Sequence, residues 1–161
     1  MSQYVNFFIR IGDRFAPIFS RSRSFTLYQV TSHELPYEGI RAIKVSDIKR
    51  WKSAIDHEIK KAEKSIIDEK ERIEMVGRFN NSVQEKLDFI DDTKIFIEDA
   101  EVEIEEMKSS IAFLEILEEM LDEADSTKYY NNDYPDRVLD PDKYIYAGVE
   151  CGLPGLEDVR E

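Results

Sequence analysis

The stretch FNNSVQE, residues 79–85, decides the fold because it separates two long runs of helical periodicity. The apolar pattern breaks at residues 79–82, and Ser82 is followed three positions later by Glu85. That pair is a capping-box pattern, typical of a helix N-terminus. The sequence therefore predicts that one helix ends near residue 79 and that a second begins at Ser82.

Both flanking segments have the apolar spacing of amphipathic helices. Apolar residues from Ile48 to Val76 step by threes, fours and sevens after Ser46, a favoured N-cap residue, which predicts a helix over 46–79. The second helix runs to about residue 124, and its main stripe is Leu87, Ile90, Ile97, Ile104, Ile111, Leu114 and Leu121. Two long helices joined so closely must run antiparallel. At 1.5 Å per residue the first helix spans about 50 Å, so the tip of the hairpin should project.

The rest of the chain reads mainly as strands. Alternating apolar residues predict strands over Tyr4–Ile11 and Tyr144–Val149. Apolar stretches near turn-rich segments predict further strands over Arg14–Phe19, Phe25–Val30 and Arg41–Val45. Pro17 cannot donate a ladder hydrogen bond, which favours an edge position for its strand. The run IAFLEILEEML, residues 111–121, is the most apolar part of either helix, so we expect it to lie beside Trp51 and against the sheet.

The predicted fold is a single α+β domain. A small antiparallel sheet from both chain ends bears a long, coiled-coil-like, antiparallel two-helix hairpin inserted between strands. Its parts are a β-rich module (1–45), the hairpin (46–124), a polar loop (125–142), a strand returning to the sheet (143–151) and a frayed tail (152–161).

Composition restricts the class of protein. The chain of 161 residues is 35% charged, above the roughly 25% typical of soluble domains. No apolar run reaches the roughly 18 residues of a membrane helix, and the start lacks the features of a signal peptide. Cys151 is the only cysteine, so neither an intramolecular disulfide nor a cysteine-based zinc site can form within one chain. We expect a soluble cytoplasmic protein.

A search for catalytic motifs is negative. His57-Glu58 begins a zinc-protease pattern, but position 61 is Lys where the second histidine is needed. The loop aspartates Asp133, Asp136, Asp140 and Asp142 miss the calcium-loop spacing and read as a solvated loop. No phosphate-binding loop or esterase elbow occurs. The sequence therefore predicts a non-catalytic protein with no metal and no cofactor.

The net charge of −13 is unevenly distributed. Residues 1–60 hold ten Lys and Arg against six Asp and Glu, whereas residues 61–126 hold eight against 21. A charged outer face is usual for a solvated hairpin, but rows of carboxylates also suit the basic groove of a nucleic-acid-handling partner. The candidate partner-binding residues are Glu103, Glu105, Glu106, Glu118 and Glu119.

Arginines in the β-rich module have two interpretations. Their guanidinium groups can bind phosphate or carboxylate and stack on aromatic rings, which predicts an anion site made by Arg10, Arg14, Arg21, Arg23 and Tyr28. Alternatively, the arginines form salt bridges to the acidic helices or protect a strand edge. A net +4 over sixty residues falls short of a nucleic-acid-binding stripe, so direct nucleic-acid binding is not expected.

The second helix has more apolar surface than a two-helix hairpin can bury. A second stripe consists of Ile95, Val102, Phe113, Ile116 and Met120. The lower part can use the sheet, and a homo-oligomer interface through Phe89, Ile95, Phe96 and Val102 is the simplest cover for the rest. The alternative is that these residues widen the stripe around the first helix.

Three functions remain open from the sequence. The first is an acidic, oligomeric interaction module or inhibitor that occupies a surface of a macromolecular partner. The second is a protein that binds or sequesters a phosphorylated small molecule or nucleotide through the arginines and aromatic residues. The third is a coiled-coil scaffold.

Overall fold

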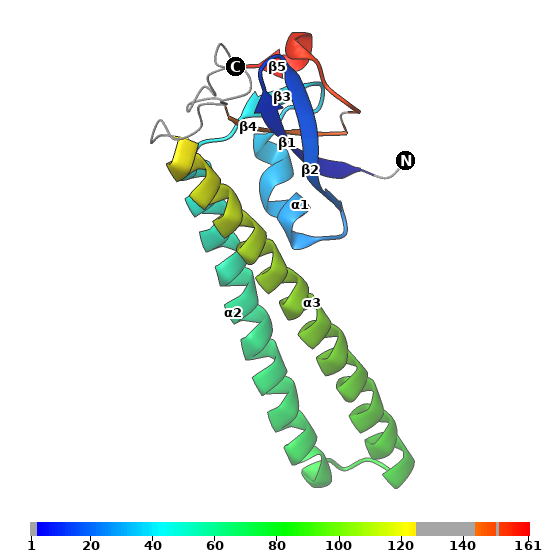
Figure 1. The fold of residues 1–161 in the computed structure, drawn as a ribbon. Helices are drawn as coiled ribbons and strands as arrows, with labels where there is room; N and C mark the ends of the chain where they lie inside the picture. Colours follow the sequence, from blue (N-terminus) through cyan, green and yellow to red (C-terminus); the bar gives the residue numbers. More distant parts are fainter. Residues whose placement is uncertain (1–2, 125–143, 151) are drawn as a thin grey trace.

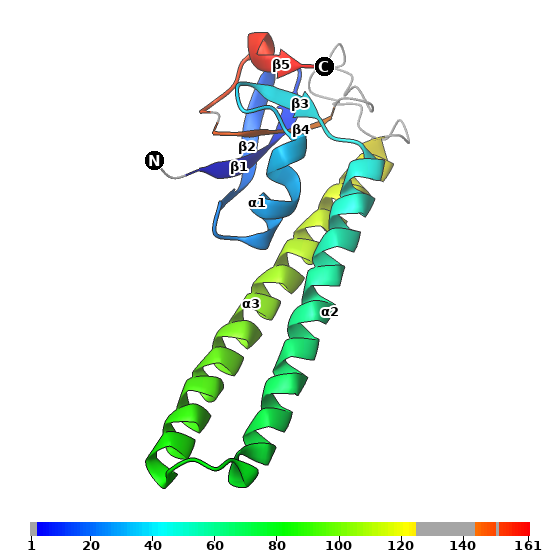
Figure 2. The same cartoon turned by 180° about the vertical axis from the view of Figure 1, so that it is seen from behind.

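A computed structural model describes residues 3–124, 144–150 and 152–161, so the predicted loop 125–142 with its aspartates, and Cys151, lie outside the described residues. The fold is α+β: a small sheet built from both ends of the chain carries a long helical hairpin (Figure 1). The same hairpin projects well beyond the sheet when the molecule is seen from behind (Figure 2). The predicted fold class is confirmed.

Five strands form the sheet in the order β2-β1-β4-β3-β5. Their bounds are β1 Tyr4–Ile11, β2 Arg14–Ser22, β3 Ile40–Ala42, β4 Ile145–Val149 and β5 Val159–Arg160. β4 pairs with both β1 and β3, so the returning strand lies at the centre and the helical hairpin is an insertion between β3 and β4. β2 is an edge strand, as Pro17 predicts, because a missing ladder donor is tolerated there.

Two segments differ from the prediction. Phe25–Val30 was predicted to be a strand, but α1, Thr26–Thr31, is a short helix in which Thr31 Oγ1 donates to the carbonyl of Leu27 (2.7 Å). The tail forms a 3₁₀ turn, η4 Leu156–Asp158, closed by the Gly155 N–H donating to the Asp158 carboxylate (2.8 Å). β5 then pairs parallel to β3, so the sheet is mixed rather than wholly antiparallel.

The hairpin consists of α2 (Val45–Met75), the 3₁₀ turn η2 (Val76–Arg78) and α3 (Val83–Ala124). Ser46 is not the N-cap of α2. The helix starts one residue earlier, and the carboxylate of Asp47 accepts the backbone N–H of Lys44 (3.0 Å). Ser82 does cap α3, because its hydroxyl accepts the backbone N–H of Glu85 (3.2 Å).

A narrow apolar seam joins α2 to α3. On α3 the buried residues alternate by threes and fours, as in a coiled coil: Thr93, Ile97, Ala100, Ile104, Met107, Ser110, Leu114, Leu117 and Leu121. The sequence pattern predicted Ile97, Ile104 and Leu114 but missed the row of Thr93, Ala100 and Met107. Leu87, expected in the seam, is exposed near the tip.

Aromatic rings dock the proximal end of the hairpin onto the sheet. The ring of Phe7, on β1, lies 6.4 Å from that of Trp51 on α2 and 5.3 Å from that of Phe113 on α3, both edge-on. Phe19, on β2, stacks on Phe113 with ring centroids 3.8 Å apart. The predicted contact between this end of the hairpin and the sheet is confirmed, and the distal part of the hairpin projects beyond the sheet.

Candidate interaction surface

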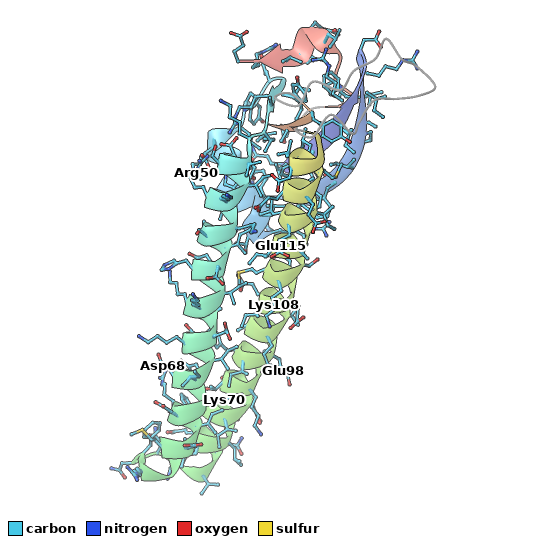
Figure 3. The ribbon with its side chains drawn as sticks, turned by 60° about the vertical axis from the view of Figure 1, so that its left-hand side comes forward. Arg50, Asp68, Lys70, Glu98, Lys108 and Glu115 are labelled. Carbon is cyan, nitrogen blue, oxygen red and sulfur yellow. The ribbon has the colours of Figure 1, made fainter. Side chains whose placement is uncertain are left out.

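The two helices of the hairpin carry very different charge. α2 contains eight Lys and Arg against eight Asp and Glu, whereas α3 contains three against fifteen. In Figure 3, Asp68 and Lys70 lie on α2, and Glu98 lies on α3 and points away from α2. The acidity of the chain therefore belongs to one helix rather than to the hairpin as a whole.

An apolar ladder lies on the outer side of α3, opposite the seam. Ile95, Val102 and Ile116 are 57%, 70% and 55% exposed. They are separated by seven or fourteen residues, so they lie along one line of the helix. Because residues two positions further on, Ile97 and Ile104, are buried in the seam, this line faces away from α2.

Two rows of carboxylates frame the distal half of the ladder. Residues three or four positions from Ile95 and Val102 are their neighbours on the helix surface. Those neighbours are Asp91, Glu98 and Glu105 on one side and Asp92, Asp99 and Glu106 on the other. All are exposed except the half-buried Glu106, whose carboxylate accepts the hydroxyl of Ser110 (2.9 Å). We call Ile95, Val102 and these six acids the acid-framed ladder.

The predicted partner-binding carboxylates do not share one environment. Glu105 and Glu106 belong to the acid-framed ladder, where Glu105 also forms an exposed ion pair with Lys108 (3.9 Å), and Glu119 is exposed nearer the sheet. Glu103 lines a groove of about 260 Å³ between the helices. Glu118 instead forms an ion pair with Lys52 across the hairpin (3.0 Å), so it is engaged within the chain.

Sequence reasoning missed four members of the frame, namely Asp91, Asp92, Glu98 and Asp99. Their spacing from Ile95 and Val102 was a usable signal, but only once those two residues were known to face away from the seam.

The residues predicted for an oligomer interface are also divided. Ile95 and Val102 form the ladder. Phe96 is exposed and lines the groove together with Lys61, Ser65, Asp99 and Met107 among others. Phe89 lies at the tip, where its ring is 5.8 Å from that of Phe79 and under the guanidinium of Arg72 at 5.4 Å. It is therefore half-buried within its own chain.

The arginines of the sheet do not converge on one site. Arg10 and Arg21 lie at opposite ends of the β1–β2 ladder, where they pair with Phe15 and Val5, which puts them about 17 Å apart along the strand. Arg10 donates to the carbonyl of Gly12 (2.8 Å) and to the hydroxyl of Tyr146 (3.3 Å).

Arg21 has a different environment. Its guanidinium lies 4.1 Å from the ring centre of Phe19 and 5.6 Å from that of Phe25. Arg14 and Arg23 are exposed, and Tyr28 donates its hydroxyl to Gln3 (2.9 Å). Within the described ranges, none of the four candidate arginines forms an ion pair with a carboxylate.

A separate polar network fixes the start of α2 and is structural. Asp47, which is buried, accepts hydrogen bonds from Arg41 (3.0 Å) and Arg50 (2.8 Å), and Glu34 accepts from Arg50 and from the indole of Trp51. Burial raises the pKa of Asp47, but hydrogen bonds from Arg41 and Lys44 outweigh it, so the pKa lies below its ordinary value. Burial also raises the pKa of Glu34, but the hydrogen bonds from Arg50 and Trp51 outweigh that effect. The pKa of Glu34 therefore also lies below its ordinary value.

Two other classes of site are absent from the described part of the chain. There, no cluster of three or more His, Cys, Asp and Glu side chains is arranged to hold a metal ion. None of the helices it contains combines the length and apolar character required to cross a membrane. The acid-framed ladder is thus the surface feature that most needs explanation.

Comparison with known proteins adds no further guide, because no family model, no curated protein and no solved structure matches the chain.

Proposed function

We propose that this protein is a non-catalytic binding module that holds a positively charged region of another macromolecule on the outer face of α3. The observation that carries the proposal is the acid-framed ladder. Isolated exposed apolar side chains are ordinary, but Ile95 and Val102 lie in line and are bordered by carboxylates on both sides.

Both components of the ladder favour association with a cationic surface. Burying Ile95 and Val102 removes apolar area from water, which supplies binding free energy. The flanking carboxylates complement Lys or Arg on the partner, which raises the association rate and excludes anionic surfaces. A protein that occupies a basic surface in this way acts as an inhibitor wherever that surface is the partner's own working groove.

Photo-crosslinking tests this proposal. A photoreactive amino acid replaces Val102 in one version of the protein and Ile67, which is 56% exposed on the charge-balanced α2, in a control. In extracts of cells that make the protein, we expect only the Val102 version to crosslink a partner, through a surface rich in Lys and Arg. Combining Glu98→Lys with Glu105→Lys should abolish that crosslink. Equal crosslinking from both positions, or a contact surface without cations, would contradict the proposal.

A homo-oligomer through the same face stays a prediction. Two copies meeting at Ile95 and Val102 would bring their own Glu98 and Glu105 rows together, and like charges oppose that contact. Self-association by this route must therefore strengthen as salt screens the carboxylates, whereas binding to a cationic partner must weaken. Light scattering of the protein alone at low and high salt measures self-association, and the yield of the Val102 crosslink at the same salt concentrations measures binding to the partner.

A second candidate function is the binding of a phosphorylated small molecule at Arg21. It is favoured by one observation: the guanidinium is held against two aromatic rings, with one hydrogen bond to the Ser20 carbonyl (3.0 Å) and no carboxylate partner in the described residues. Thermal unfolding with ATP or inorganic phosphate tests it. Saturation to about 100 times the dissociation constant stabilises by about 2.7 kcal/mol, and Arg21→Gln should remove that gain while Arg14→Gln should not. No gain with either ligand would contradict this candidate.

A further inference from the structure

The spacing within the acid-framed ladder restricts the shape of what can cover it. Ile95 and Val102 are two helical turns apart, about 10.5 Å. A partner helix repeats apolar side chains at the same seven-residue interval, so it can meet both with its own neighbouring turns. A strand presents side chains of one face every 6.6 to 6.8 Å or so, which does not match this interval.

The frame restricts the partner's charge. Asp91, Glu98 and Glu105 line one side of the ladder, and all are exposed. The exposed Asp92 and Asp99 lie on the other side with Glu106. Nucleic acid and anionic lipid are repelled by both rows, and a second α3 brings the same two rows with it. The face therefore suits a cationic polypeptide.

The frame also fixes the length of the contact. It extends from Asp91 to Glu106, about 22 Å or four turns of helix. Toward the sheet, the next residue of the second row is Phe113, which stacks on Phe19 and so is already covered. The framed segment ends where the sheet begins to pack on α3.

We infer that the element docking on α3 is a basic amphipathic α-helix of about four turns, with an apolar heptad stripe between two rows of Lys or Arg, belonging to a different protein. This inference rests on the proposed function and adds the shape of the partner to its charge. The docked helix lies along α3 between residues 91 and 106.

Two designed peptides of about 18 residues test the inference against the full chain. One has leucines in a heptad stripe flanked by lysines, and the other has the same composition with the leucines scattered around the helix. Fluorescence anisotropy measures the affinity of each. We expect the striped peptide to bind about tenfold more tightly, because only it buries its leucines against Ile95 and Val102.

Substitutions locate the contact and separate the two proposals. Val102→Ser should weaken the striped peptide about tenfold and leave the scattered one unchanged, while the control Ile67→Ser on α2 should affect neither. Both sites are exposed, and circular dichroism checks that each variant remains folded. Glu98→Gln combined with Glu105→Gln should weaken both peptides.

Each alternative outcome has a defined meaning. Equal binding of the two peptides, lost in the Glu98→Gln and Glu105→Gln variant, would overturn the helical partner but leave the acidic binding module standing. An equal effect of Ile67→Ser and Val102→Ser would overturn the site. Failure of both peptides to bind would overturn the inference and the proposed function together.

Discussion

Replacing Asp47 with Asn should destabilise the protein by about 2 to 4 kcal/mol. Asp47 is 8% exposed and accepts hydrogen bonds from Arg41, Arg50 and the backbone N–H of Lys44 at 2.8 to 3.0 Å. Asn keeps an oxygen for the helix cap but loses the charge that two guanidinium groups share. A buried hydrogen bond to a charged group contributes about 1.5 to 3 kcal/mol to the free energy of unfolding. The hydrogen bond from Arg50 contributes less than this, because Arg50 is half-exposed and water screens its charge.

Urea unfolding followed by circular dichroism measures this loss. The matched control is Asp56→Asn, because Asp56 pairs with Lys60 at 3.0 Å on the exposed face of the same helix. Such a surface pair contributes about 0 to 1 kcal/mol. A loss for Asp47→Asn below about 1 kcal/mol, or no larger than for Asp56→Asn, would refute the assignment of this network as the anchor of α2.

The network also gives the stability a defined dependence on pH. Folding lowers the pKa of Asp47, so its contribution is fully present above the unfolded value of about 4 and is lost as pH falls through the lower folded value. The pKa of Glu34 is lowered too, so it acts in the same direction. The difference in stability between the unmodified protein and Asp47→Asn should therefore shrink below about pH 4. A difference that stays constant to lower pH would contradict the role given to the carboxylate charge.

Three further predictions follow from the hairpin. Leu114→Ala should lower the free energy of unfolding, measured in urea, by about 2 to 5 kcal/mol because Leu114 is fully buried. Ile116→Ala should lower it little, because Ile116 lies two residues further on and is exposed. Similar losses in the two variants would contradict the assigned seam. Adding salt should stabilise the protein, since it screens repulsion among the carboxylates of α3, and a urea midpoint that falls with salt would contradict this. Glu101→Lys should reduce that dependence on salt, because Glu101 lies four residues from Glu105 on the same face of the helix. If the urea midpoint of this variant changes with salt as much as that of the unmodified protein, the repulsion is contradicted.

The hairpin was predictable from sequence because its signals are long and agree with one another. The break at residues 79–82 and the helical period on both sides extend over some eighty residues. α1 was mistaken for a strand because its six residues are too few to separate a period of two from one of 3.6. β5 has only two residues and pairs with β3, so nothing local in the sequence marks it as a strand.

The candidate site was only half predictable for a specific physical reason. Ile95 and Val102 are apolar and were found from sequence. Their orientation depends on the second row of the seam, which includes Thr93 and Ala100 and is too weakly apolar to register as a stripe. Without that row, Ile97 and Ile104 alone left open whether the ladder residues widened the stripe around the first helix, so the carboxylates that frame the ladder were interpreted as an ordinary charged surface.

The charge difference between the two helices argues that the acidity of α3 is not there for folding. Both helices belong to one hairpin and share one seam, yet α2 is electrically balanced while α3 has fifteen acids against three bases. Like-charged pairs four residues apart, such as Asp99 with Glu103 and Glu101 with Glu105, each cost an isolated helix about 0.2 to 0.5 kcal/mol. Mixed charges of the kind present on α2 would avoid that cost at no loss to the seam. A local conflict that stability alone does not explain is typical of functional surfaces, and the conflict in α3 is concentrated around its exposed apolar ladder.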